Sequence, residues 1–454
     1  MRHVTTLSLW AVVSGLLVPA GGTVHAQQSP STARTAAQAP AVTSQYVDPA
    51  RGLSVKQLVQ FALTRNADLL ATRQRTIEAQ GLLRQAGFRP NPVVETEFSS
   101  GSPTGSSGED EWSVGYSHIF ELGGKRARRV DVGRTGIELA RFEISDRERT
   151  VRAELQERYI TAMAAIRNLE AIAQQLDITR QSFVVTERRV SAGESPRVEQ
   201  MVLQAELGRL EAERVVLTSE VQQEMLALRV VAGMDLQEPL VLQPDGDRPP
   251  AALTVEEAVE QGFASRPDLA AARQEEARSA AEVRLARADR VPDVAALVRY
   301  SDSRTRFDQF GLTQAGVPSP LRDRDRVLTG GLSITLPLLA RNQGVIAAAR
   351  ARETAASFRR EFVAKSVEAE IRGAYGRYAA TRQAVDVFNK SVIQPSQQSV
   401  TVLRASYAAG EVRLFDVLTE QRRLIDTQKA YTEAIRQEAL ARVALERAIG
   451  AALQ

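Results

Sequence analysis

The chain of 454 residues contains no cysteine and only three histidines. Without cysteine, the protein has neither a disulfide framework nor a cysteine that could carry a lipid. His3 and His25 lie in an N-terminal segment that we expect to be removed, which leaves His118. A thiolate site and a site of several imidazoles are therefore excluded, and we expect no bound metal and no cofactor.

Aromatic residues are also scarce, at 5% of the chain, which suits long helices packed through Leu, Ala and Val better than a large globular core. Charged residues reach 25%, but the net charge is only +3. This balance is typical of solvated helical faces and gives no support for a nucleic-acid partner. Neither a nucleophile elbow nor a phosphate-binding loop occurs, so an enzyme is the least favoured class.

The N-terminus has the features of a secretory signal peptide. A basic start precedes an apolar stretch from Leu7 to Pro19, and Val24-His25-Ala26 offers a cleavage site. The apolar stretch is shorter than the ~20 residues of a membrane-spanning helix, which disfavours the alternative of a transmembrane anchor. We expect a signal peptide over 1–26 and a flexible arm over 27–52.

Leu122-Gly123-Gly124 separates two different patterns. Before it, Glu111 to Glu121 alternates apolar and polar residues, which predicts a half-buried strand. After it, residues 125–191 contain no proline, and from Leu155 to Leu176 apolar residues recur at alternating spacings of four and three. This coiled-coil stripe predicts one helix of roughly 100 Å, at about 1.5 Å per residue.

Caps and helix breakers predict the other elements of this half. Ser54 is a helix cap, Pro90 and Pro92 stop the helix that follows, and Gly193 suits a left-handed helix end. The predicted order is a helix from Ser54 to about Phe88, a hairpin of strands over 93–99 and 111–121, the long helix over 125–191, a tight tip at Gly193, and a helix from Pro196 to Gly233.

The second half repeats the first. Leu53-Ser54-Val55 recurs as Leu253-Thr254-Val255, an offset of 200, and Ala192-Gly193-Glu194 recurs as Ala409-Gly410-Glu411, an offset of 217. One duplication with a longer hairpin loop in the second copy explains both offsets. The predicted organisation is a first repeat over 53–233, a linker over 234–252 and a second repeat over 253–454, with strands over 294–300 and 327–336, a loop over 303–325 and a break near Pro395.

Four strands with one apolar and one polar face cannot close alone, and open sheet edges cannot face lipid. Exported chains with such strands complete a barrel in the outer membrane. The predicted fold is mainly α: a long helical-hairpin barrel with four strands per chain, which complete a 12-stranded membrane β-barrel as a homotrimer. The aromatic residues expected to face outer-membrane lipid are Trp112, Tyr116, Phe120 and Tyr300; the alternative is that they pack against a small soluble helical layer.

In repeat order, strand placement and both tip sequences, the chain resembles the TolC family of outer-membrane efflux proteins over nearly its whole mature length. Phe120-Glu121-Leu122-Gly123-Gly124-Lys125-Arg126 resembles more narrowly the CzcC-like branch, which serves heavy-metal resistance pumps. The resemblance implies a trimer with a twelve-stranded barrel in the cell outer membrane and a periplasmic helical tunnel. It also implies two partners, an inner-membrane resistance-nodulation-division (RND) pump and a periplasmic adaptor, or membrane fusion protein.

The resemblance further implies a closed periplasmic entrance at the helix tips. Tyr407, Gly410 and Asp416 match the family's gate pattern Tyr-x-x-Gly-x5-Asp, and Glu199 matches the acidic latch residue of the first hairpin. Three copies of Asp416 on one axis would attract cations. The alternative for Asp416 is a residue that favours the start of a helix.

The chain departs from this gate pattern at two positions. Thr419 replaces the usual second carboxylate, and Val412 replaces the usual latch base, so that Arg413 is the nearest substitute. The adaptor is expected to dock at the tips around Gly193 and Gly410.

The leading hypothesis is a passive exit duct for heavy-metal cations of the cobalt, zinc and cadmium class. Two alternatives share its architecture, a multidrug efflux channel and a type I secretion channel. An alternative of another class is a periplasmic coiled-coil scaffold or adaptor, which would be soluble without detergent.

Overall fold

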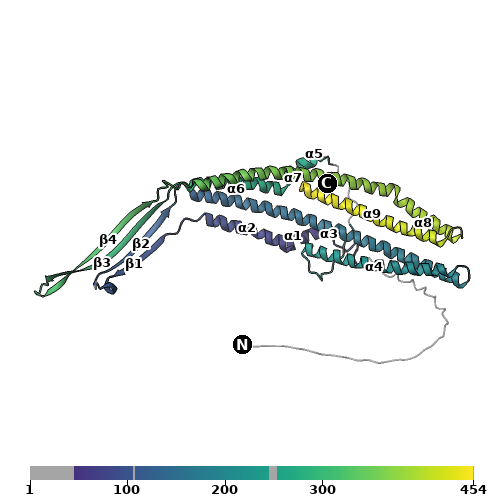
Figure 1. Cartoon of the computed structure of the whole chain (residues 1–454), viewed down its shortest axis with the longest axis horizontal. Coiled ribbons are helices and arrows are strands. Elements are labelled where there is room, and N and C mark those ends of the chain that lie inside the picture. The colour runs from purple at the N-terminus through teal and green to yellow at the C-terminus, as the bar shows by residue number, and fades with distance from the viewer. Residues whose placement is uncertain (1–44, 106–107, 245–252, 453–454) are drawn as a thin grey trace, which may run out of the picture. The chain divides into compact units, whose positions relative to one another are not determined.

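The computed structural model describes residues 45–105, 108–244 and 253–452. The predicted signal peptide and the arm up to residue 44 lie outside these residues. Figure 1 shows the long helices and the four strands. The helices are α1 Val55–Arg65, α2 Ala67–Ala86, α3 Lys125–Ser191, α4 Arg197–Ala232, α5 Val255–Ser265, α6 Pro267–Ala288, α7 Gln343–Ser391, α8 Ile393–Ala408 and α9 Leu414–Ile449, with the short 3-10 helix η1 Ser102–Thr104; the strands are β1 Val93–Ser100, β2 Asp110–Phe120, β3 Val294–Leu312 and β4 Pro318–Ile334.

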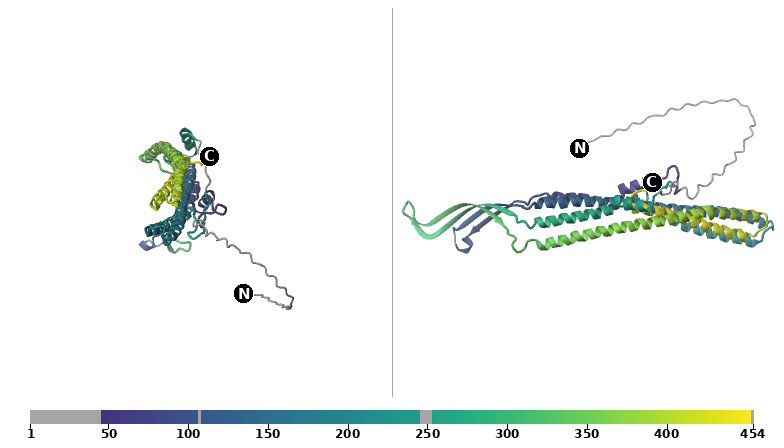
Figure 2. Two further views of the ribbon diagram at one scale, coloured as in Figure 1. Left: turned by 90° about the vertical axis from the view of Figure 1, so that its right-hand side faces the viewer. Right: turned by 90° about the horizontal axis from the view of Figure 1, so that it is seen from above.

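The order of elements from α1 to α4 recurs from α5 to α9, with α7 and α8 together in the place of α3. In both halves, a helical hairpin follows the second strand. Figure 1 shows α3 beside α4, and α8 beside α9. Figure 2 shows the two hairpin tips next to each other, at the helix ends away from the strands.

The predicted long helix is confirmed as α3, whose 67 residues run without a break. Most of the predicted stripe is buried, with Leu155 and Leu169 fully inaccessible and Tyr159 only 2% exposed, while Ala173 is half-buried. The stripe packs against α1 and against Val221, Met225 and Leu228 of α4. Each fully buried Leu contributes about 1.5–3 kcal/mol, so this seam holds the first repeat together.

The prediction of one helix from Ser54 to Phe88 is wrong, because the helix breaks at Asn66. The backbone of Asn66 is extended, with ψ of 117°. Its side chain accepts a hydrogen bond from the backbone N–H of Leu69 at 3.0 Å and donates one to the carbonyl of Val231 at 3.0 Å. Asn66 therefore caps α2 and ties it to α4, as a short polar side chain does at a helix start.

The predicted break near Pro395 is confirmed. α7 ends at Ser391, Val392 leaves the helical region with φ of −120°, and Pro395 lies in the first turn of α8. A proline there removes no needed helical N–H. Its counterpart Ile178 lies inside the unbroken α3.

Parts of the predicted arm and linker are held together by backbone hydrogen bonds. The N–H of Leu53 bonds the carbonyl of Val241 at 2.8 Å, and the N–H of Leu242 bonds the carbonyl of Tyr46 at 2.8 Å. Leu242 is fully buried in the core of the first repeat. Residues 45–52, expected to be loose, are thus anchored on the helices.

The four strands form one antiparallel sheet in the order β1-β2-β3-β4. Side chains that are directly opposite in such a sheet share a face. The register places all four predicted aromatic residues on one face, with the rings of Trp112 and Tyr300 5.5 Å apart. The other face carries polar pairs, and Arg299 bonds Glu95 at 3.2 Å and Glu97 at 3.0 Å there.

The prediction of a loop over 303–325 is wrong, because β3 continues to Leu312 and β4 begins at Pro318. Arg and Asp alternate from Arg322 to Arg326 of β4, and the charged residues of β3 alternate with Ser and Thr; this charged pattern resembles a loop in the sequence. The backbone ladder continues through it, and the carboxylate of Asp302 binds Arg324 at 2.7 Å and Arg326 at 3.1 Å. β4 also ends earlier than predicted, at Ile334.

Among the helices in the described part of the chain, none is both long and apolar enough to cross a membrane.

Candidate gate at the helix tips

The two hairpin tips are built in the same way. Gly193 has φ of +77° and Gly410 has φ of +80°, a left-handed conformation that favours glycine. In the first tip, the N–H of Gly193 bonds the carbonyl of Val190, and in the second the N–H of Gly410 bonds the carbonyl of Tyr407. These bonds satisfy carbonyls that a helix end leaves without partners. Both tips therefore turn sharply.

Tyr407 of α8 joins the second hairpin to the first. Its hydroxyl donates a hydrogen bond of 3.1 Å to the carboxylate of Glu199, in the first turn of α4. The guanidinium of Arg189 lies 5.8 Å from the centre of the Tyr407 ring. Two predicted site residues, Tyr407 and Glu199, are thus in direct contact.

The surroundings of Tyr407 are largely apolar. Its ring packs on a cluster of Leu203, Leu414 and Leu418, which come from both hairpins. Burial raises the pKa of the Tyr407 hydroxyl, the carboxylate of Glu199 raises it further, and a hydrogen bond with Thr186 opposes both. The phenol is therefore held in its neutral form, which is the form that can donate to Glu199.

Asp416 and Arg413 are exposed at the start of α9. The carboxylate of Asp416 accepts a hydrogen bond of 3.2 Å from the backbone N–H of Arg413, so Asp416 caps the start of α9. The structure thus shows the helix-start geometry of Asp416, with its carboxylate still open to solvent. In the part of the chain that the structure describes, the Arg413 side chain makes no ion pair within 4.0 Å.

A buried carboxylate links the two hairpins further from the tips. Glu206 of α4 is 4% exposed, and it binds Arg209 of α4 at 2.8 Å and Arg422 of α9 at 2.6 Å. Burial opposes ionisation of Glu206, but the two arginines outweigh it and hold its pKa below the ordinary value. One heptad on, Glu213 of α4 binds Lys429 of α9.

A polar layer lies next to the Glu206 contact, since Gln421 precedes Arg422 in α9. The side-chain amides of Gln175 of α3 and Gln421 of α9 lie 3.2 Å apart. Arg404 of α8 lies 3.0 Å from the Gln421 amide. Burial lowers the pKa of the Arg404 guanidinium. The three polar side chains connect α3, α8 and α9.

The motif that resembles the metal-resistance branch forms the joint between the sheet and α3. Lys125 binds Asp293 at 2.8 Å and is almost buried, and Arg129 binds Glu121. Arg129 also donates to the carbonyl of Phe88, two residues past the end of α2. The motif therefore fixes the direction in which α3 leaves the strands.

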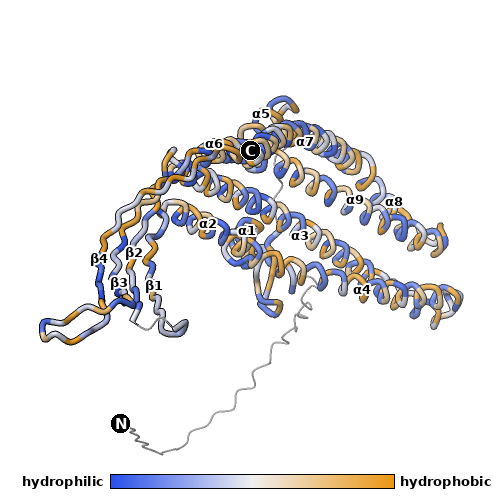
Figure 3. The backbone as a smooth tube through the Cα atoms, turned by 60° about the vertical axis from the view of Figure 1, so that its left-hand side comes forward, coloured by the Kyte–Doolittle hydropathy of each residue, from blue (hydrophilic) through white to orange (hydrophobic). Residues whose placement is uncertain are grey.

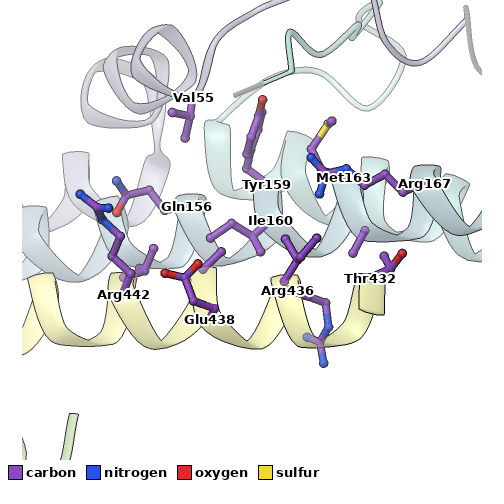
Figure 4. A pocket seen from close by; sticks show the side chains of 14 residues that line it. Val55, Gln156, Tyr159, Ile160, Met163, Arg167, Thr432, Arg436, Glu438 and Arg442 are labelled. Atoms are coloured by element: carbon purple, nitrogen blue, oxygen red, sulfur yellow. The ribbon is translucent and has the colours of Figure 1, made fainter. Parts of the chain in front are cut away.

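A pocket of about 210 Å³ lies between α1, α3 and α9. Figure 4 shows Gln156 of α3 near Arg442 and Glu438 of α9, while the side chain of Tyr159 points away from α9. Burial raises the pKa of Glu438. Within the described residues, no group of three or more His, Asp or Glu side chains is placed to hold a metal ion.

Sequence reasoning did not find Arg189, Arg404 or the Glu206 and Glu213 contacts. The sequence does contain a pattern that indicates the Glu206 and Glu213 contacts: Glu206 and Glu213 are seven residues apart, and so are their partners Arg422 and Lys429. Opposite charges at heptad spacing are typical of neighbouring helices in a coiled coil.

Comparison with known proteins gives a consistent result. The model of the family described as "Outer membrane efflux protein" matches residues 58–234 and 258–451. The chain is 23% identical to the cobalt-zinc-cadmium resistance protein CzcC of Cupriavidus metallidurans, over 88% of this chain and 90% of that protein. It is 27% identical to the nickel-cobalt-cadmium resistance protein NccC of Alcaligenes xylosoxydans xylosoxydans, over 64% of this chain and 62% of that protein.

Solved structures share the fold. The outer membrane protein VceC of Vibrio cholerae matches with a TM-score of 0.69 at 20% identity, over 88% of this chain and 97% of that one. CusC matches with a TM-score of 0.70 at 18% identity, over 93% of this chain and 99% of that one.

Proposed function

Because the chain belongs to the family of outer membrane efflux proteins, we propose that it is the passive outer-membrane exit duct of a tripartite RND-type efflux system and that its cargo is heavy-metal cations. The duct performs no chemistry. An inner-membrane RND pump supplies the energy, and a periplasmic adaptor docks at the tips around Gly193 and Gly410. The proposal includes an N-terminal signal peptide that is cleaved after Ala26.

One structural observation supports the duct. The same chain carries an amphipathic four-stranded sheet, whose edge strands β1 and β4 each have one unpaired side within the described residues, and two helical hairpins joined at their tips. Open edges at membrane depth need a partner. In a homotrimer, β1 of one copy pairs with β4 of the next, which closes a barrel of twelve strands.

The polar face of the sheet then lines the duct. Glu95, Glu97 and Arg299 project from that face, while Trp112, Tyr116, Phe120 and Tyr300 on the other face meet lipid. Aromatic residues at the outer rim of a barrel are typical of membrane interfaces.

The proposed cargo rests on similarity to two proteins whose names describe resistance to cobalt, zinc, cadmium and nickel. At the gate, Asp416 from three copies would form a ring of carboxylates, which favours cations over anions. Tyr407 and Glu199 would latch the tips in the closed state.

Two measurements test the proposal. The first is the mass of the intact complex extracted from outer membranes with detergent, where a heat-sensitive trimer is expected. A soluble periplasmic monomer would instead support the scaffold class.

The second measurement is the tolerance of a deletion strain to cobalt, zinc and cadmium, set against its tolerance to dyes and detergents. Loss of metal tolerance alone is expected, with recovery when the gene is returned. Loss of tolerance to dyes and detergents alone would indicate multidrug efflux. If the deletion strain keeps its tolerance to metals, dyes and detergents, a type I secretion channel is favoured.

A further inference from the structure

The apolar rows around Trp112 are followed along β3 and β4 by a group of arginines. Directly opposite residues share a face, and Trp112 lies opposite Asp302, which lies opposite Arg326. The next two rows on this face pair Arg304 with Arg324 and Arg306 with Arg322. We call these five residues the arginine band: Arg304, Arg306, Arg322, Arg324 and Arg326. Figure 3 shows this hydrophilic stretch of β3 and β4 beyond the more apolar part of the strands.

The arginine band lies at the strand ends away from the helices. α3 follows the Phe120 end of β2, and α7 follows the Ile334 end of β4. The band lies toward the other end of both strands, before the turn between Leu312 and Pro318, so it is on the side of the membrane opposite the helical hairpins. In an outer-membrane duct whose hairpins are periplasmic, this is the outer leaflet.

The band carries more positive charge than its own face neutralises. Asp302 is 2% exposed and binds Arg324 and Arg326. Asp110, opposite Arg304, accepts a hydrogen bond of 2.6 Å from Ser100. These two carboxylates face five arginines, which leaves three positive charges in excess on this face of each chain.

Three arginines of the band form no ion pair among the described residues. Within the described residues, no carboxylate lies within 4.0 Å of Arg304, Arg306 or Arg322. All three are exposed, and Arg306 and Arg322 are directly opposite each other. Like charges in such a pair repel, so an anion between them would stabilise the hairpin.

The depth of the band matches a layer of lipid headgroups. Trp112 and Phe98 mark the end of the apolar face, and aromatic residues of this kind sit at the membrane interface. Arg304 and Arg306 lie two and four residues beyond the Trp112 row, or about 7 and 14 Å at roughly 3.4 Å per residue. The headgroup layer is about 5–8 Å thick on each side of the bilayer, so the Arg304 row lies within it and the Arg306 row lies just outside it.

We propose that the arginine band binds the phosphate groups of a phosphorylated outer-leaflet glycolipid of the lipid A type. Guanidinium groups bind phosphate in a bidentate manner, and paired arginines on adjacent strands can hold one phosphate between them. The apolar rows below the band would contact the acyl chains of the same lipid. This inference rests on the proposed function only for the placement of the sheet in the outer membrane.

Trp112 provides a reporter beside the band. The chain has two tryptophans, and Trp10 lies in the predicted signal peptide. The full-length protein, purified from outer membranes in a zwitterionic detergent, is titrated with diphosphoryl lipid A while the fluorescence of Trp112 is recorded. The same titration uses lipid A from which both phosphates have been removed, and inorganic phosphate.

The test variant is Arg304→Gln, Arg306→Gln and Arg322→Gln together. Since each arginine near an anionic surface contributes about a factor of five, the apparent Kd for diphosphoryl lipid A should rise on the order of 100-fold. The matched control replaces with Gln three exposed arginines of α7 that also form no ion pair with any residue that the structure describes: Arg350, Arg359 and Arg377. It should bind like the wild type. Replacing the three band residues with Lys keeps the charge and should cause a smaller loss.

Equal affinity of the wild type and the Gln variant would overturn the proposal, as would equal binding of the dephosphorylated lipid. Complete displacement of the lipid by inorganic phosphate would show a phosphate site without a lipid, which also overturns it. If the Gln variant does not form the wild-type oligomer, the proposal is tested instead with the Lys variant and with the salt dependence of lipid binding by the wild type. Wild-type binding that does not weaken as salt is added would contradict a role for the arginine band. A wrong cargo would leave all these results unchanged, because no arm of the experiment measures export.

Discussion

The hydroxyl of Tyr407 donates a hydrogen bond of 3.1 Å to the carboxylate of Glu199, across 208 residues of sequence. Tyr407 is at the end of α8, and Glu199 is in the first turn of α4. The bond therefore connects the two hairpins where the chain turns most sharply. Opening the tips by moving one hairpin away from the other would break it.

Tyr407→Phe should loosen the closed tips. The substitution keeps the ring in its apolar cluster and removes only the donor, leaving Glu199 without this partner. A hydrogen bond to a charged group is worth about 1.5–3 kcal/mol, and the half-exposed site places the loss at the low end. In planar bilayers, the variant should spend more time in conducting states than the wild type.

The control for this substitution is Tyr431→Phe. Tyr431 of α9 donates to Asn389 of α7, so its bond lies within the second repeat and does not join the two hairpins. Conductance should be unchanged. Equal traces for Tyr407→Phe and the wild type would show that this contact does not hold the gate.

Asp416→Asn should weaken the preference of the duct for cations. Asn keeps an oxygen that can accept from the N–H of Arg413, so the start of α9 is preserved while the charge is lost. The ratio of cation to anion permeability, from reversal potentials in a salt gradient, should fall. Asp426→Asn, an exposed carboxylate further along α9, is the matched control. An unchanged ratio would remove Asp416 from the gate.

Glu206 should make the protein less stable in acid. Its pKa is depressed in the folded protein, so its contribution is complete above the unfolded value of about 4.3 and is lost as pH falls through the folded value. Glu206→Gln should lower the free energy of unfolding at pH 7 by about 3 kcal/mol, because it leaves Arg209 and Arg422 without their buried partner. Thermal unfolding of the wild type and of Glu206→Gln, at pH 7 and below pH 4, measures both the loss of stability in acid and the effect of the substitution.

The difference in stability between wild type and Glu206→Gln should shrink in acid. Glu211→Gln is the control, because Glu211 pairs with Arg180 at 2.7 Å and both side chains are about half exposed. An exposed pair of this kind contributes about 0–1 kcal/mol. Equal effects of the two substitutions would contradict the assignment of Glu206 as the linking residue.

Much of the fold could be predicted from the sequence because its signals are local. The proline-free stripe of α3, the glycines of the tips and the alternation in β2 each have a direct physical cause, and each was predicted nearly to the residue. The charged halves of β3 and β4 could not be predicted in this way, because Arg and Asp favour a strand there only through their partners on the neighbouring strand. Asn66 was missed for a related reason, since a cap inside an apolar pattern shows only when its hydrogen bonds are seen.

The candidate gate was also predicted only in part. The positions of Tyr407, Asp416 and Glu199 were identified from resemblance, but no spacing in the sequence indicates that Tyr407 contacts Glu199. Arg189 and Arg404 carry no motif, and their roles depend on which faces of α3 and α8 meet. Which faces meet depends on packing between segments that are distant in the sequence. The heptad pattern reduces the number of possible faces but does not select one.

Alanine should cost more stability at Gly123 than at Gly124, two adjacent glycines in the joint between the sheet and α3. Gly123 and Gly124 both have positive φ, at +71° and +73°. A methyl group on Gly123 would lie 2.7 Å from the Cβ of Val291, whereas one on Gly124 would meet nothing within 4 Å. Gly124→Ala should therefore cost only the left-handed strain of about 1 kcal/mol, and Gly123→Ala should cost roughly 1–3 kcal/mol more through the clash. Thermal unfolding of the two variants checks this order, and equal melting temperatures would mean that the close contact with Val291 does not constrain the joint.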